Sequence, residues 1–198
     1  ATAALSARAS RASVAAVSTV ASVAAATALS ITVAPGATVS VSAAAAIAAR
    51  TTAAVPTAHP TATGMAAITL LLHAMLEPGD RLVVPHDAYG GSWRLFDALA
   101  RKGHFELVTA DLTDPRALAM ALSRGPKLVL VETPSKPLLR VTDLRFVIDA
   151  AHRAGARVAV DNTFLSPALQ TPIAFGADVV LHSTTKYLGG HSDVLGGA

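Results

Sequence analysis

The chain has 198 residues, no cysteine, 52% hydrophobic but only 4% aromatic residues, and a formal net charge of +3 at pH 7. The lack of cysteine excludes a disulfide framework, a thiolate metal site and a cysteine nucleophile, and it fits a cytoplasmic location. The small, scattered charge predicts no nucleic-acid partner and no membrane partner. The length is typical of one domain with its own core.

Residues 1–62 differ in composition from the rest of the chain. They are mostly Ala, Ser, Thr and Val, their only full charges are Arg8, Arg11 and Arg50, and the first acidic residue is Glu77. Four interpretations are open: a transit peptide, a membrane span, a low-complexity tail, or letters that are not the natural residues. A span is disfavoured because Ala, Ser and Thr gain little from lipid.

From Thr63 onward, strand and helix patterns alternate at short intervals. The expected helices cover residues 65–76, 92–102, 114–122 and 143–154, and the expected strands cover 81–84, 105–109, 127–131, 157–160 and 178–181. Short apolar strands that alternate with helices are typical of an α/β fold, a mostly parallel sheet with helices on both faces. In the second helix, Trp93, Phe96, Leu99 and Ala100 are expected to lie on one face.

Polar residues follow four of the expected strands. These loops are residues 85–91, 132–135, 161–163 and 182–186. The carboxyl ends of parallel strands share one edge of the sheet, and ligands bind at that edge. The sequence therefore predicts that an aromatic ring, two carboxylates, several hydroxyls and a lysine meet there.

This combination suits a pyridine cofactor attached to a lysine. Such a lysine must lose its proton, so Lys186 is expected where a charge is disfavoured or shared with another cation. A carboxylate is needed to keep the ring nitrogen protonated, and Asp161 follows a buried strand. Tyr89 offers a ring for stacking.

A phosphate-binding element is also present in the pattern. Gly64 and Met65 open a helix, and the backbone N–H groups of a helix start bind phosphate. The hydroxyls of Ser183 and Thr185 lie near Lys186 in the sequence. No metal site is expected, because His182, His191 and Asp193 lack the spacing of metal ligands.

Residues 161–193 (DNTFLSPALQTPIAFGADVVLHSTTKYLGGHSD) closely resemble the cofactor segment of the family that contains cystathionine γ-synthase, γ-lyase, β-lyase and methionine γ-lyase. PHDAYGGSWRLF, TGMAAI and ETPSKPLLR resemble further segments of that family, in the family's order, so the resemblance covers residues 63–198. It implies a fold type I large domain of a pyridoxal 5'-phosphate (PLP) enzyme.

The resemblance also implies roles for individual residues. Lys186 would carry the cofactor, Asp161 would bind its ring nitrogen, and Tyr89 would stack on the ring and assist the leaving group. The phosphate would be held by the backbone of Gly64 and Met65 and by the hydroxyls of Ser183 and Thr185. Asn162 and Thr163 would contact these residues and hold them in position without being the main cofactor contacts.

The function that the resemblance implies is a PLP-dependent reaction of sulfur amino-acid metabolism on a small amino-acid substrate. Residues 166–170 are most similar to bacterial γ-synthases, which favours γ-replacement on an O-acylhomoserine. A γ-lyase that cleaves cystathionine or methionine is the alternative. The family also implies a homotetramer, a dimer of dimers, with its sites at the dimer interface.

Three features depart from the family pattern. Lys136 stands where the family usually has an Asn near the cofactor's phenolic oxygen; it adds a positive charge there unless the side chain turns away or the letter is an error. A Tyr-Ser-Arg…Asn-Pro-Thr motif expected near residues 34–42 is missing, which favours altered letters as the explanation for residues 1–62. The chain stops at Ala198 before the family's C-terminal domain, so residues 63–198 are expected to be a truncated large domain.

Two alternatives of other classes stay open. One is a catalytically incompetent fragment of a PLP enzyme, favoured by the three departures. The other is a hydrolase that uses Ser, His and Asp from the same loops, although the sequence contains no Gly-x-Ser-x-Gly nucleophile turn.

Overall fold

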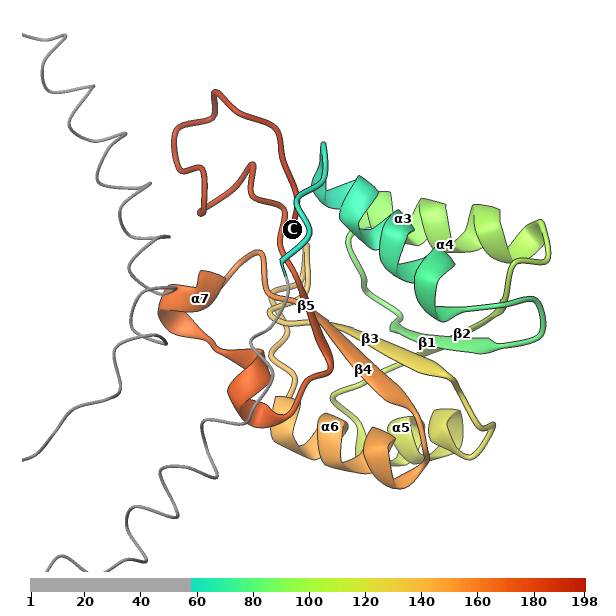
Figure 1. Cartoon of the computed structure of the whole chain (residues 1–198). Helices are drawn as coiled ribbons and strands as arrows, with labels where there is room; N and C mark the ends of the chain where they lie inside the picture. The colour runs from blue at the N-terminus through green and yellow to red at the C-terminus, as the bar shows by residue number, and fades with distance from the viewer. Residues whose placement is uncertain (1–57) are drawn as a thin grey trace, which may run out of the picture. The chain divides into compact units, whose positions relative to one another are not determined.

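The computed structural model describes residues 58–198, and these belong to a compact unit that covers Pro56–Ala198. Five strands form one sheet in the order β2-β1-β3-β4-β5 (Figure 1), and every neighbouring pair is parallel. The strands are β1 (Arg81–Pro85), β2 (Glu106–Ala110), β3 (Leu128–Glu132), β4 (Arg157–Asp161) and β5 (Val179–Leu181). The expectations for residues 1–57, including the missing front motif, lie outside the described residues.

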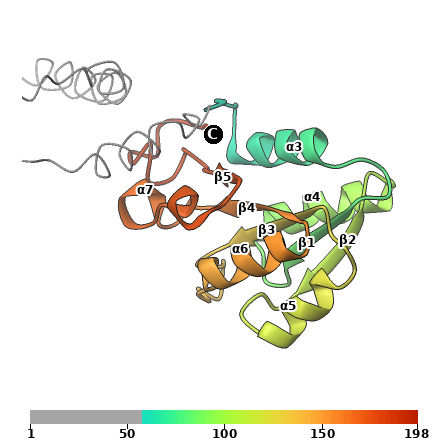
Figure 2. The same ribbon diagram turned by 60° about the horizontal axis from the view of Figure 1, so that its bottom comes forward.

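Helices cover both faces of the sheet, as the sequence predicted. Helices α3 (Gly64–Met75) and α4 (Gly90–Arg101) lie on one face, and α5 (Pro115–Leu122) and α6 (Leu144–Arg153) lie on the other (Figures 1 and 2). A short helix α7 (Ser166–Leu169) and a 3₁₀ turn η1 (Pro172–Phe175) connect β4 to β5. These two short elements were not predicted.

The apolar strands supply two cores, one for each face. In β3, Leu128 and Leu130 pack towards α3 and α4, whereas Val129 and Val131 pack towards α5 and α6. All four side chains are buried. Successive side chains of a strand point to opposite faces, so a strand covered on both sides needs an uninterrupted apolar run.

Local signals fix most helix ends. The Asp114 carboxylate accepts a hydrogen bond from the amide of Arg116 at the start of α5, and Asp143 accepts one from Phe146 at the start of α6. Such N-caps satisfy amide groups that the helix itself leaves unpaired. Gly155 follows α6 with φ +79, a conformation that favours glycine.

The apolar residues of α4 are buried to different degrees. Phe96 is fully buried, but Trp93 is 39% exposed, and Ser92 is buried instead. Leu99 and Ala100 are partly buried against the same core. The first turn of α4 borders the cavity, where Ser92 takes the inner position.

The chain order across the sheet places a switch point between β1 and β3. From β1 the chain moves outward to β2, and it then crosses to the other side of β1 to build β3, β4 and β5. In parallel α/β sheets, the loops on either side of such a point leave in opposite directions and open a crevice beyond the carboxyl ends. The loops after β1 and β3 border that crevice.

The two ends of the described segment meet beside this crevice. The amide of Thr61 donates to the carbonyl of Gly197 at 2.8 Å, and the amide of Gly197 donates to the carbonyl of Thr61 at 3.0 Å. The start of α3 is therefore held against the segment that follows β5. The C-terminus accordingly lies near the start of α3 in Figure 1.

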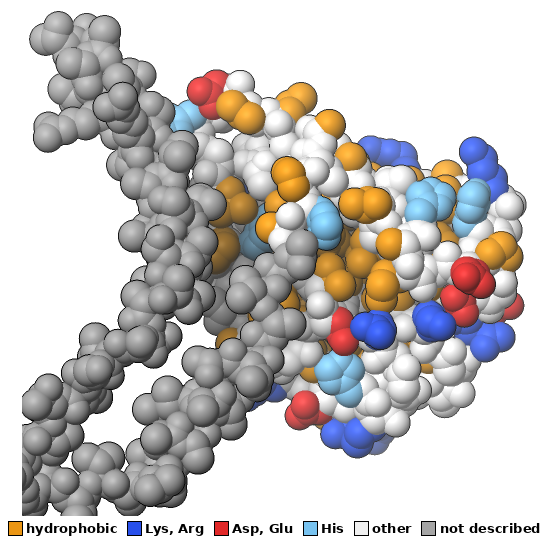
Figure 3. Space-filling view, viewed as in Figure 1, with side chains coloured by type: hydrophobic (Ala, Val, Ile, Leu, Met, Phe, Trp, Pro, Cys, Tyr) orange, Lys and Arg blue, Asp and Glu red, His pale blue; other side chains and the backbone are white. Residues whose placement is uncertain are grey.

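The surface carries no field of one sign on the face drawn in Figure 3, where basic and acidic side chains lie in small, mixed groups. Within residues 58–198, no helix combines the length and the apolar character needed to cross a membrane.

Candidate functional site

A cavity of about 730 Å³ lies at the switch point. All eight residues that the sequence singled out for a cofactor site line this one cavity, although they come from four separate segments. They are Gly64, Met65, Tyr89, Asp161, Thr163, Ser183, Thr185 and Lys186. The fold thus brings together every predicted residue, while their roles towards a ligand stay predictions.

Two carboxylates stand side by side at the base of the cavity. Glu132 ends β3, Asp161 ends β4, and the two are partners in the parallel register of these strands. Burial raises the pKa of Asp161, while hydrogen bonds from Thr163 and the positive charge of a protonated His182 act in the opposite direction. No ion pair within residues 58–198 involves Asp161. A positively charged ligand group would supply the missing partner for its anion.

Glu132 connects two loops of the cavity wall. One of its oxygens accepts the amide N–H of Tyr89 at 2.8 Å, and the other accepts the amide N–H of Lys136 at 2.9 Å. The residue is only 6% exposed. Burial raises its pKa from 4.5 to about 7, the two amide hydrogen bonds lower it, and the nearby charges of Asp161 and Asp87 raise it.

A phosphate-sized anion has donors at the start of α3. Thr63 caps this helix by accepting from the amide of Ala66, which leaves the amides of Gly64 and Met65 without a partner in residues 58–198. A Cβ placed on Gly64 would lie 2.6 Å from the Cβ of Ser183, so only glycine permits this close approach. The helix start and Ser183 together form a narrow cradle of donors.

The two predicted hydroxyls differ in availability. Thr185 donates to the carbonyl of Gly196 and accepts from the amide of the same residue. The Ser183 hydroxyl has no hydrogen bond within the described residues, and its amide is held by the hydroxyl of Thr163 at 2.8 Å. Ser183 is therefore the hydroxyl that is ready to donate to an anion.

Lys186 lines the cavity from the turn that follows β5, but its side chain is exposed. The exposure follows from the short β5, which ends five residues before Lys186, so that the lysine projects beyond the sheet edge. The expectation that its charge is disfavoured or shared with another cation stays a prediction. Tyr89 is likewise 45% exposed on the opposite wall.

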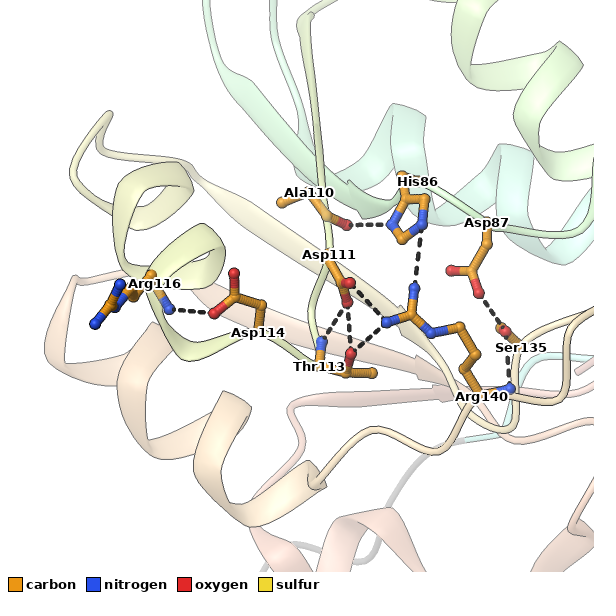
Figure 4. Close-up of polar contacts among 9 residues, drawn as sticks. All are labelled: His86, Asp87, Ala110, Asp111, Thr113, Asp114, Arg116, Ser135 and Arg140. Carbon is orange, nitrogen blue, oxygen red and sulfur yellow. Dashed lines mark hydrogen bonds and ion pairs between the residues drawn. The ribbon is translucent and has the colours of Figure 1, made fainter.

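The loop that follows β3 is fastened at several points (Figure 4). The guanidinium of Arg140 donates to Asp111 at 2.6 Å and to Thr113 at 2.7 Å, and it lies 3.2 Å from the ring of His86. The hydroxyl of Ser135 donates to Asp87 at 2.6 Å. These contacts join the loops after β1, β2 and β3 into one framework behind the cavity.

Some contributors to the cavity were not foreseen. Glu132 was expected as one of two carboxylates at the sheet edge, but no role was predicted for it. Its hydrogen bonds depend on the register of two strands, which the sequence does not give. Ser92 lines the cavity, and its buried hydroxyl has no partner among the described residues. Lys136 also lines the cavity, so its side chain does not turn away.

Asn162 supports the site without entering the cavity. It is fully buried, and its side-chain amide exchanges hydrogen bonds with Gln170. This contact fixes α7 beside β4. Within residues 58–198, no group of three His, Cys, Asp or Glu side chains has a geometry that would hold a metal ion.

The raised pKa of Glu132 predicts a pH-dependent stability. The folded state holds the proton more tightly than the unfolded state, so the contribution of Glu132 is fully present below pH 4.5 and is lost as the pH rises through about 7. The loss amounts to about 3 kcal/mol, at 1.36 kcal/mol per pH unit. Urea denaturation of the wild type and of Glu132→Gln across this pH range should show a stability difference that changes by this amount.

Asp149→Asn is the matched control, because Asp149 is exposed on α6 and makes no side-chain hydrogen bond within the described residues. Its stability difference from the wild type should stay nearly constant with pH. A Glu132→Gln difference that is equally constant would contradict the assigned environment of Glu132.

Comparison with protein families agrees with the arrangement of the cavity. The family described as "Cys/Met metabolism PLP-dependent enzyme" matches residues 37–198. The chain is 59% identical to cystathionine γ-synthase of Escherichia coli over 137 residues, which are 69% of this chain and 36% of that protein. It is 43% identical to cystathionine γ-lyase of Bacillus subtilis over 136 residues, again 69% of this chain and 36% of that protein.

A solved structure shares the fold. It is cystathionine γ-synthase from Xanthomonas oryzae pv. oryzae in complex with aminoacrylate and cysteine, with a TM-score of 0.69 and 74% identity over 70% of this chain and 36% of that one. The chain therefore spans about a third of the length of the relatives that it matches. The family match and these identities confirm the resemblance inferred from the motifs: the chain belongs to the PLP-dependent enzymes of cysteine and methionine metabolism.

Proposed function

We propose that this chain carries the PLP site of an enzyme that performs γ-replacement on an O-acylhomoserine, as a cystathionine γ-synthase does. The observation that carries the proposal is the cavity that unites Lys186, Asp161, Tyr89 and the start of α3. The higher identity to the synthase of E. coli (59%) than to the lyase of B. subtilis (43%) supports the synthase branch. The lyase reaction is the second candidate, because the chain is also 43% identical to the γ-lyase of B. subtilis.

The residues present fit PLP. The narrow cradle at Gly64 and Ser183 suits a phosphate, because a side chain at Gly64 would fill it. Asp161 is a largely buried carboxylate without a cationic partner in the described residues, which suits a protonated pyridine nitrogen. Lys186 offers the primary amine that an aldehyde requires, and the ring of Tyr89 faces the same space.

When bound, PLP supplies an aldehyde for attachment and a protonated ring that accepts an electron pair from the substrate. The Nζ of Lys186 would take the proton from the α-carbon of the substrate as a general base. The same Nζ would then carry a proton to or from the β-carbon. The Asp161 carboxylate would hold the ring nitrogen in its protonated state.

The chain's further contributions are positional. The amides of Gly64 and Met65 and the Ser183 hydroxyl would hold the phosphate. Tyr89 would stack on the ring and exclude water from it. Glu132 holds the backbone of Tyr89 in place through its 2.8 Å hydrogen bond.

We further propose that the protein assembles with copies of itself into a homotetramer. Tyr187, Leu188, Val194 and Leu195 are between 48% and 72% exposed in the isolated chain. Tyr187 and Leu195 also line the cavity, so a second copy that covers this segment would complete the wall. A cytoplasmic location is part of the proposal, supported by the metabolic relatives and by the absence of cysteine.

The Gly64 cradle predicts how the phosphate is recognised. Gly64→Ala should lower the preference for PLP over pyridoxal at least about tenfold, because the new Cβ pushes Ser183 and the helix start apart. Equilibrium titration with both compounds measures this preference. Gly90→Ala is the control, since its Cβ would meet only the guanidinium of Arg94 at 3.6 Å. An unchanged preference in Gly64→Ala would contradict phosphate binding at Gly64 and Ser183.

Product analysis tests the proposed reaction. The protein loaded with PLP is incubated with an O-acylhomoserine, with and without cysteine. Cystathionine formed only when cysteine is present would support γ-replacement, whereas a keto acid and ammonia formed with either mixture would support the lyase. Lys186→Met should form neither product. A loaded wild-type protein that forms neither would contradict the proposal and favour the incompetent fragment.

A further inference from the structure

Four charged side chains line the cavity: Glu132, Lys136, Asp161 and Lys186. The proposed function uses Asp161 and Lys186 for the cofactor. Both oxygens of Glu132 are already committed to the amides of Tyr89 and Lys136. The charge of Lys136 alone has no assignment among these four.

The backbone of Lys136 is firmly placed. Its amide donates to Glu132 at 2.9 Å. The preceding residue, Ser135, exchanges backbone hydrogen bonds with Arg140 and Leu139 and donates its hydroxyl to Asp87 (Figure 4). Hydrogen bonds therefore fix the backbone of Lys136 at the cavity wall. Its side chain makes no ion pair within the described residues and is available to a ligand.

The ammonium of Lys136 lies against aromatic rings rather than against a carboxylate. Its Nζ is 5.8 Å from the ring centre of Tyr89 and 5.9 Å from that of Phe164. No ion pair within residues 58–198 involves Lys136. Aromatic faces attract a cation weakly, and an anion that enters the cavity gives the ammonium a stronger, charge-assisted partner.

We propose that Lys136 binds a carboxylate of the amino-acid substrate and makes the site selective for ligands that bear this group. The inference rests on the proposed function and adds a specificity residue to it. The selectivity comes from the positive charge that Lys136 brings to the cavity wall. The carboxylate belongs either to the α-position or to the far end of the substrate side chain, and the experiment separates these sources.

Three ligands with one carbon skeleton provide the test: L-glutamate, L-glutamine, which lacks the side-chain carboxylate, and L-isoglutamine, which lacks the α-carboxylate. Their dissociation constants are measured with the full chain loaded with PLP, from the change in cofactor absorbance. The wild type should bind L-glutamate at least about tenfold more tightly than one of the two amides. Weaker L-isoglutamine indicates the α-carboxylate, and weaker L-glutamine indicates the distal one.

Lys136→Met keeps the length of the side chain but removes its charge, and Lys136→Arg keeps the charge. Lys136→Met should bring the ratio of dissociation constants close to one, whereas Lys136→Arg should retain the preference. Ratios that are unchanged in Lys136→Met, or equal to one in the wild type, would overturn the role of Lys136. A wild-type chain that takes up no PLP would instead contradict the proposed function on which the inference rests.

Discussion

The parallel register between β3 and β4 is the constraint on which the site depends. It places Glu132 directly beside Asp161 at the carboxyl edge of the sheet, next to the switch point. Ionising both carboxylates in this position costs free energy unless each has a hydrogen-bond donor or a cation beside it. Two backbone amides donate hydrogen bonds to Glu132. Asp161 faces the cavity, where a cationic ligand group is the natural partner for its carboxylate.

The same register explains how separate segments reach one place. The amides that Glu132 accepts belong to the loops after β1 and β3, so one buried side chain sets the position of Tyr89 and of Lys136. Behind these loops, the contacts of Arg140 with Asp111 and Thr113 tie the end of β2 to the same framework. The cavity wall is thereby built from loops that are fixed at their backbone while their side chains remain available to a ligand.

Much of the fold could be predicted from the sequence, because its signals are local. Uninterrupted apolar runs marked the five strands, and residues such as Asp143 and Gly155 marked the ends of a helix. The short elements between β4 and β5 escaped prediction because four residues carry no readable periodicity. Periodicity grouped Trp93 with Phe96 on one face of α4 but did not give the depth of each side chain: Phe96 is fully buried, whereas Trp93 is 39% exposed.

The candidate site was predictable as a set of residues but not as an arrangement. Chemical type and strand position were enough to single out Lys186 and Asp161. The hydrogen bonds of Glu132 to the amides of Tyr89 and Lys136 depend on the register of β3 and β4. The exposure of Lys186 follows from the length of β5, which the hydrophobic pattern alone did not define. The cavity-facing direction of Lys136 likewise depends on the loop conformation.

The central claim is that Lys186 is the residue that carries the cofactor in this cavity. Borohydride reduction of the full chain after loading with PLP, followed by peptide mapping, tests this claim most directly. We expect one pyridoxyl group per chain, located on Lys186, with none on Lys136 or on the exposed Lys102. A label on Lys136, or a label spread over exposed lysines while Lys186 stays unmodified, would contradict it.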